Sequence, residues 1–156
     1  MRALGTLALA ICAAVAPPVL AQERLADTMA LVRDKARADK RVFIADNLQL
    51  TASEAQAFWP VYDRYQRDLQ AINTRIENLI RDYGRNAATM SDEGAERLVT
   101  EAAEVEAERT KLAVSYLPSF REALAGKKLA RYYQLETKIR AVLNFDLARE
   151  IPLVQP

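Results

Sequence analysis

The chain has 156 residues, with 22 basic and 21 acidic side chains, one cysteine and no histidine. A formal net charge of +1 excludes the strongly basic surface that is typical of nucleic-acid-binding domains, and one cysteine excludes a disulfide framework within the chain. Histidine is the commonest catalytic base and metal ligand, and the chain has none, so we expect no catalytic residues and no metal site. We also expect no cofactor. The near-neutral charge predicts that no nucleic acid is a partner.

The N-terminus has the three parts of a signal peptide. Arg2 is followed by an uncharged and largely apolar segment, residues 4–20, and then by a small-residue cleavage site that ends at Ala21. The sequence therefore predicts that residues 1–21 are removed on export. The mature protein, residues 22–156, is predicted to form a single domain.

Two other interpretations of the N-terminus remain open. A membrane anchor is disfavoured because Pro17 and Pro18 interrupt the apolar run, and a spanning helix needs about 20 apolar residues. Lipid attachment at Cys12 is disfavoured because Ile11 stands where a lipoprotein has a small residue. Cleavage of the signal peptide also removes Cys12, which leaves a mature chain without cysteine or histidine.

Four helices are predicted in the mature chain. The first covers about residues 23–46 and ends at Asn47. The second begins after Thr51, because Thr51 and Glu54 have the spacing of a capping box. Gly84 is predicted to end this second helix, because glycine is favoured at the left-handed position that follows a helix.

The second helix carries a continuous apolar stripe. Its apolar and aromatic residues recur at alternating spacings of three and four, which places them on one face of the helix. Such a stripe predicts burial against a neighbouring helix. Its members are Ala55, Phe58, Tyr62, Tyr65, Leu69, Ile72, Ile76, Leu79 and Tyr83.

The third and fourth helices are separated by Gly126. Ser91 and Asp92 predict the start of the third helix, as an N-cap followed by an acidic residue in the first turn. Pro152 is predicted to end the fourth helix, and Arg109 interrupts the apolar seam of the third. The third helix carries the seam Leu98, Ala102, Val105, Leu112 and Tyr116, and the fourth carries Leu129, Tyr132, Ile139 and Leu143.

Pro60 and Pro118 lie inside the second and third predicted helices. Each removes a backbone hydrogen bond and clashes with the preceding turn, which predicts a bend. Both prolines lie at similar distances from the connection between the two helices, so the two bends should give the pair a concave face. In the alternative interpretation, Pro60 starts a separate helical segment. We therefore expect an all-α fold, in which a long, bent, antiparallel helical hairpin is joined by a shorter N-terminal helix and a C-terminal helix.

This layout resembles that of the Spy/CpxP-like proteins, the LTxxQ-motif family. Leu50, Thr51 and Glu54 match the motif, with Glu54 in place of its glutamine. Ser91 and Asp92 stand where the family has a second copy, which is degenerate in this chain. The stretches FWPVYDRY and ARYYQLETKIRAVLNFDLAREIPLV are similar to a secreted subgroup with the same arrangement.

The resemblance implies a non-enzymatic periplasmic protein, often a homodimer, that binds other proteins. The first expectation is an ATP-independent chaperone that holds partly folded periplasmic clients. An alternative is a regulator of the envelope stress response that docks one sensor domain. A metal-responsive sensor is less favoured, because the relatives that sense metals rely on histidine.

Candidate client-binding residues follow from charge and aromatic character. Residues 92–108 are acidic and residues 109–140 are basic, which indicates either ordinary solvated helix faces or a bipolar surface for partners of mixed charge. Long basic side chains cover apolar surface while their charge stays in water. The aromatic candidates have a second interpretation, as core residues. The candidates are Phe58, Trp59, Tyr62, Arg121, Lys127, Lys128, Arg131 and Arg140.

Overall fold

The structure, a computed structural model, describes residues 39–154. These residues form helices and connections without a β-strand, which confirms the predicted all-α fold. The predicted signal peptide, including Cys12, and most of the predicted first helix lie outside the described residues.

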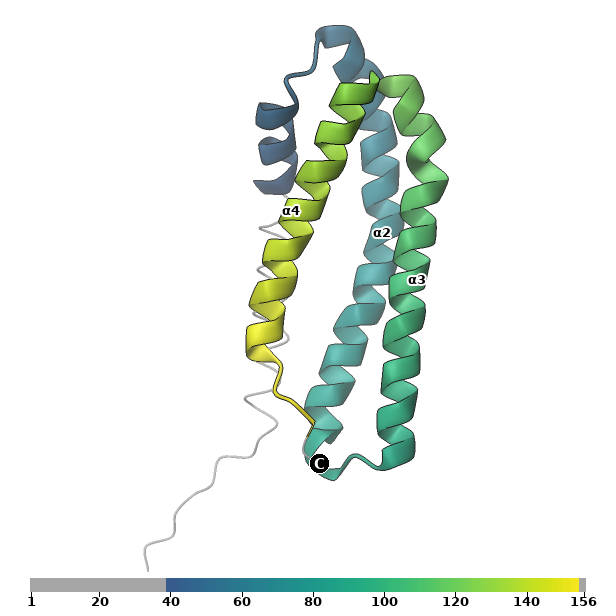
Figure 1. The fold of residues 1–156 in the computed structure, drawn as a ribbon, viewed down its shortest axis with the longest axis vertical. Coiled ribbons are helices and arrows are strands. Elements are labelled where there is room, and N and C mark those ends of the chain that lie inside the picture. Colours follow the sequence, from purple (N-terminus) through teal and green to yellow (C-terminus); the bar gives the residue numbers. More distant parts are fainter. Residues whose placement is uncertain (1–38, 155–156) are drawn as a thin grey trace, which may run out of the picture.

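Residues 39–48 are helical and precede three long helices. These are α2 (Ala52–Asn86), α3 (Asp92–Ala123) and α4 (Gly126–Glu150), and a short 3₁₀ helix, η1 (Ala87–Thr89), follows α2. Figure 1 shows α2 and α3 side by side along their length, with α4 and residues 39–48 on the other side of the molecule.

The predicted caps of α2 and α3 are confirmed. The Thr51 hydroxyl accepts a hydrogen bond from the Glu54 amide at 3.3 Å, and the Thr51 amide donates to the Glu54 carboxylate at 2.8 Å. Ser91 accepts from the Gly94 amide at 3.2 Å, with Asp92 as the first residue of α3. These bonds satisfy backbone groups that have no partner within the first turn of a helix.

Two predicted helix ends are wrong. Gly84 lies inside α2, because the turn that follows continues the same helical sense and the Ala87 amide donates to the Tyr83 carbonyl. The first helix passes through Asn47, and its end is instead marked by Gln49, whose φ of 50° is left-handed.

Pro60 and Pro118 lie inside continuous helices, so the alternative in which Pro60 starts a separate segment is wrong. Each proline is two residues from an aromatic core residue, Phe58 or Phe120. The rings of Phe58 and Phe120 pack at 5.8 Å between centroids, so the antiparallel register of α2 and α3 brings the two prolines to the same level. The predicted bends stay a prediction.

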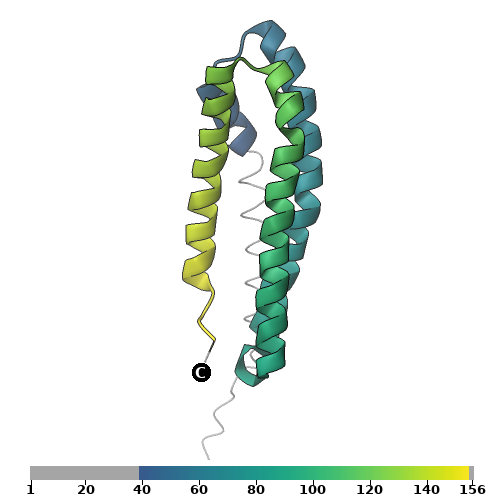
Figure 2. The same cartoon turned by 45° about the vertical axis from the view of Figure 1, so that its right-hand side comes forward.

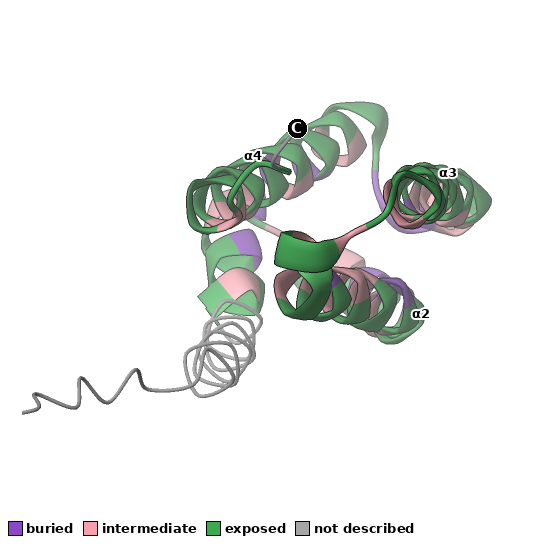
Figure 3. Cartoon of the chain, turned by 90° about the horizontal axis from the view of Figure 1, so that it is seen from below, coloured by how far each residue is buried: buried purple, intermediate pink, exposed green. Residues whose placement is uncertain are grey.

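Most of the predicted stripe on α2 is buried. Among its buried members, Phe58 and Tyr65 pack against Phe120 of α3, and Phe58 and Tyr62 pack against Tyr132 of α4. Figure 3 shows exposed residues over the outer surfaces of the helices. On α3 the predicted seam fails at Ala102, which is exposed, whereas Val105 is buried. The main core cluster consists of Ile44, Leu48, Phe58, Val61, Tyr62, Tyr65, Leu69, Phe120, Ala123, Leu124, Tyr132 and Leu135.

Helix α4 stands away from the pair formed by α2 and α3 (Figure 2). Within the described residues, no α-carbon of α4 lies within 8 Å of an α-carbon of α2, and few lie that close to α3. Large side chains bridge this distance: the ring of Tyr132 packs against Phe58 and Phe120 at 5.2 and 4.7 Å. Past the C-terminal end of α4, the Tyr83 hydroxyl donates to the Pro152 carbonyl at 2.7 Å. Helices in direct contact have axes about 8–10 Å apart, so the wider separation leaves space between these two attachments.

Candidate functional site

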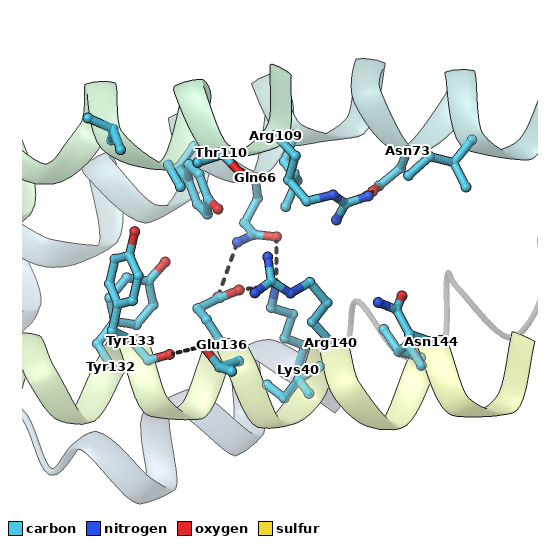
Figure 4. Close-up of a pocket in the computed structure, with 18 of the residues that line it drawn as sticks. Lys40, Gln66, Asn73, Arg109, Thr110, Tyr132, Tyr133, Glu136, Arg140 and Asn144 are labelled. Carbon is cyan, nitrogen blue, oxygen red and sulfur yellow. Dashed lines mark hydrogen bonds and ion pairs between the residues drawn. The ribbon is translucent and has the colours of Figure 1, made fainter. Parts of the chain in front are cut away.

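A groove with a volume of about 290 Å³ lies between α2, α3 and α4. Figure 4 shows Lys40, Gln66 and Glu136 near its centre, with Arg109 and Asn73 on one wall and Arg140 and Asn144 on the other. The volume is close to the lower limit of small-molecule sites, which run from about 300 to 1,000 Å³.

Apolar side chains from all three helices line much of the groove. They extend from the aromatic core toward the C-terminal half of α4, so the groove has one aromatic end and one aliphatic end. The apolar and aromatic lining residues are Tyr65, Leu69, Ile76, Ala113, Val114, Phe120, Tyr132, Tyr133, Ile139, Leu143 and Leu147.

A polar network crosses the middle of the groove. The Lys40 ammonium lies 2.7 Å from one Glu136 carboxylate oxygen and donates to the Gln66 side-chain oxygen at 3.2 Å. Gln66 in turn donates to the other Glu136 oxygen at 3.4 Å. The Lys40 and Glu136 side chains are only 12% and 17% exposed. Glu136, the only carboxylate among the described lining residues, is therefore already paired.

Arg109 brings a poorly compensated positive charge to the opposite wall. Its side chain is 13% exposed and donates to the Asn73 side-chain oxygen at 3.2 Å. Its Nε is buried and has no hydrogen-bond partner in the described structure. The nearest described carboxylate is that of Glu106, which lies 3.8 Å from the Arg109 Nε. The Glu106 side chain is 64% exposed, so water weakens this ion pair.

Arg140 adds a second positive charge from α4. Within the part of the chain that the structure describes, no ion pair or hydrogen bond engages its guanidinium. The described charged lining residues are thus three cations and one carboxylate. Because Glu136 is paired with Lys40, the excess positive charge of the groove comes from Arg109 and Arg140.

The aromatic end of the groove contains a buried hydroxyl. Tyr132 is 1% exposed, and no hydrogen bond of ordinary geometry reaches its hydroxyl in the described structure. Burial, and then the nearby Glu136 carboxylate, raise the pKa of Tyr132 far above its usual value. Burial likewise raises the pKa of Tyr65 to about 12. Both side chains therefore stay neutral, and both keep a proton to donate, at neutral pH.

The residues that resemble the LTxxQ motif have structural roles in this fold. Leu50 packs against the core, and Thr51 and Glu54 form the capping box. Lys128 donates to the Glu54 carboxylate and also to the Gln49 carbonyl at 3.0 Å, which ties α4 to the start of α2. The Lys128 ammonium, followed by the Thr51 amide, lowers the pKa of Glu54 to about 2.

The aromatic candidates for client binding divide into core and surface. Phe58 and Tyr62 are 0% and 3% exposed, so both occupy the core that was their second interpretation. Trp59 is partly buried, and the Arg41 guanidinium lies 4.1 Å above the centre of its ring. This cation–π contact covers one face of the indole.

The cationic candidates do not converge on one place. Arg121 and Lys127 are exposed on α3 and at the start of α4. Arg131 donates from Nε to the Asn47 carbonyl at 2.6 Å, next to the contacts of Lys128. Of the eight candidates, only Arg140 lines the groove.

Sequence reasoning missed most of the polar residues of the groove. Lys40, Gln66 and Asn73 look like ordinary solvent-facing helix residues in the sequence. Arg109 did give a signal, because it interrupts the apolar seam of α3, and the structure places it in the groove wall. An interruption of this kind marks a position where the helix face does not pack against apolar neighbours.

Comparison with known proteins identifies no relative of this chain: no family model, curated protein or solved structure matches it. The described residues contain no cluster of three or more histidine, cysteine, aspartate or glutamate side chains that is suited to hold a metal ion. Among the described helices, none is long and apolar enough to span a membrane.

Proposed function

We propose that this protein is a non-enzymatic protein-binding protein of the periplasm that holds partly folded clients without ATP. The observation that carries the proposal is the separation of α4 from the α2–α3 pair, which leaves a groove with apolar walls. An open surface with apolar area and scattered cations suits weak, adaptable contacts with chains of different sequence.

Exposed apolar side chains near the groove extend this surface. Val114 and Tyr133, which are 56% and 39% exposed, lie at the edge of the groove on α3 and α4. Val142 and Phe145 of α4, which are 62% and 64% exposed, share a side of the helix that the helical period turns away from the groove-lining Leu143 and Leu147. Exposed apolar area that is contiguous with the groove, such as that of Val114 and Tyr133, marks an interaction surface.

The sequence supports the cellular setting of the proposal. The predicted signal peptide, residues 1–21, directs export, and the layout with the motif at Leu50, Thr51 and Glu54 resembles the Spy/CpxP-like family. Members of that family act as chaperones or as regulators of envelope stress signalling. The runner-up function is therefore docking to one sensor domain.

The test is an aggregation assay with residues 22–156. Several unrelated denatured proteins are diluted into buffer with and without the purified chain, in the absence of nucleotide, and light scattering is followed. We expect suppression that survives a chelator and that weakens only in part when salt is raised from low to moderate concentration, because screening acts on charge and not on apolar burial.

A matched pair of variants locates the surface. Val114→Ser with Tyr133→Ser removes apolar area from the edge of the groove, and Val142→Ser with Phe145→Ser removes exposed apolar area from the side of α4 that faces away from it. The Val114 and Tyr133 variant should lose suppression, and the Val142 and Phe145 variant should keep it. Equal activity of the two variants contradicts this client surface. Failure to suppress any of several clients, together with tight capture of a single sensor domain, assigns the protein to the regulator function. Activity that a chelator abolishes favours the metal-responsive alternative.

A further inference from the structure

We propose that the groove between α2, α3 and α4 is a binding site for a small amphiphilic carboxylate, a fatty acid of medium chain length. The carboxylate lies between Arg109 and Arg140, and the alkyl chain follows the aliphatic end of the groove. This binding uses the same groove as the proposed client holding, but it does not depend on that function and has its own direct readout.

Charge complementarity selects the headgroup. Lys40 and Glu136 neutralise each other at 2.7 Å, whereas Arg109 and Arg140 have no comparable partner among the lining residues. Arg109 is also largely withdrawn from water, with a side chain 13% exposed. A charge in such a position interacts more strongly with an anion than a fully solvated charge does.

Hydrogen-bonding capacity leads to the same chemical class. The unmatched groups of the groove carry protons: the Arg109 Nε–H has no hydrogen-bond acceptor, and no hydrogen bond or ion pair within the described residues engages the Arg140 guanidinium. Leaving such a buried group without a hydrogen-bond partner is unfavourable. An ionised carboxylate supplies acceptors and no donors, so it satisfies these groups without adding an unmatched proton. An alcohol or an amine headgroup brings a donor to a site that already has an excess of donors.

The shape of the groove selects a single chain. Its volume of about 290 Å³ is small, which excludes a bulky lipid with two chains from full burial. Beyond the two arginines, the lining includes the aliphatic side chains of Ile76, Leu143 and Leu147, beside the polar side chains of Asn73 and Asn144. An alkyl chain placed there gains free energy in proportion to the apolar area that it removes from water.

The test compares three ligands that share one alkyl chain and differ in headgroup charge. Decanoate, decanol and decyltrimethylammonium are titrated into residues 22–156 by calorimetry, below their micelle concentrations. We expect decanoate to bind about tenfold or more tightly than decanol, since hydrogen bonds to charged groups are worth more than neutral ones. The cationic compound should bind more weakly than decanol.

Variants separate the headgroup contacts from the chain contacts. Arg140→Gln and Arg109→Gln should each lower decanoate affinity about tenfold and leave decanol affinity unchanged. Arg121→Gln is the matched control, because Arg121 is an exposed arginine on α3 outside the groove lining. Leu147→Ser should weaken decanoate and decanol equally, whereas Leu153→Ser, at a position 87% exposed, should weaken neither.

Circular dichroism establishes that each variant is folded. Arg140→Gln is the primary test, because the Arg140 side chain is exposed and its replacement disturbs the fold less than that of the more buried Arg109. Equal affinity for decanoate and decanol overturns the proposal. So does unchanged decanoate affinity in a folded Arg140→Gln variant, or the absence of decanoate binding to the unaltered protein.

Discussion

Phe120 should be the most sensitive single position for stability, because its ring joins three helices. The side chain is 2% exposed and belongs to α3. It contacts two aromatic residues of α2, one of its own helix and one of α4. The ring centroids of these neighbours lie at 4.7 Å for Tyr132, 5.8 Å for Phe58 and Tyr65, and 6.2 Å for Tyr116.

Phe120→Ala removes the ring and leaves a cavity among these neighbours. A buried phenylalanine replaced by alanine loses about 3–5 kcal/mol, since the transfer term and the cavity term add. The rings around Phe120 belong to long helices that are attached at several other points, so collapse of the cavity should be incomplete and the loss should fall within this range. For a domain of this size the melting temperature should fall by about 10–20 °C.

The assay is urea unfolding followed by far-ultraviolet circular dichroism, with thermal melts alongside. Phe145→Ala is the control, because it removes the same ring from a side chain that is 64% exposed on α4. That variant should lie within about 0.5 kcal/mol of the unaltered protein. A loss below about 1 kcal/mol for Phe120→Ala, or equal losses for the two variants, would refute the reasoning that the aromatic cluster holds α4 to the pair.

Three further measurements test local features of the fold. Thr51→Ala should cost about 1 kcal/mol of unfolding free energy through the lost cap, whereas Thr74→Ala on the exposed side of α2 should be near neutral; equal effects would argue against the capping role. The folded-state pKa of Glu54 is lowered from 4.5 to about 2, so its stabilisation is complete above pH 4.5 and is lost as the pH falls toward 2. When the pH is lowered from about 7 to about 3, the Glu54→Gln variant should therefore lose less unfolding free energy than the unaltered protein in urea titrations. An identical loss would contradict a stabilising role for the ionised Glu54 carboxylate. The folded-state pKa of Tyr65 is raised from 10.0 to about 12. The contribution of the neutral Tyr65 side chain to the free energy of unfolding is therefore complete below pH 10 and is lost as the pH rises through 12. Tyrosinate absorbance from buried residues such as Tyr65 and Tyr132 should then appear together with unfolding, and ionisation of all tyrosines in the folded state would disprove their burial.

Features encoded within a few neighbouring residues could be predicted from the sequence. The capping box depends on Thr51 and Glu54, three residues apart, and is formed as expected. The stripe on α2 depends only on the helical period, which fixes the face that Phe58, Leu69 and Tyr83 share, and all three are buried. Pro60 did not break the helix, because the apolar period continues on both sides of it and the tertiary packing holds both halves.

Helix ends were less predictable, because several local solutions satisfy the last carbonyls of a helix. Gly84 allows a left-handed cap but does not require one, and α2 instead tightens into the η1 turn. At the end of the first helix the left-handed position is occupied by Gln49, although glutamine has no special preference for it. Sequence preference at such positions is a weak guide compared with the path that the connection must follow.

The groove could not be predicted, because it depends on contacts between residues that are distant in the sequence. The pairing of Lys40 with Glu136 requires the register between residues 39–48 and α4, which no periodicity within either segment contains. The separation of α4 from α2 results from the size of the rings between them, with Tyr132 packed against Phe58 at 5.2 Å. Binary patterning identifies which face is buried, but it does not give the distance between two faces.

Arg109 gives a signal in the sequence and also lies in the wall of the groove. A leucine at position 109 would continue the seam from Val105 to Leu112 and would avoid placing a guanidinium with an unsatisfied Nε in the groove wall. Burial of a poorly paired charge destabilises a fold, and a well-packed apolar replacement is often neutral or stabilising. Within the described helical pair, the arginine gains only the hydrogen bond to Asn73 and the ion pair of its Nε with the exposed Glu106 carboxylate at 3.8 Å. Proteins tend to break a local rule at functional sites, and an interruption that presents donors to an apolar groove, opposite Arg140, has the features of a binding determinant.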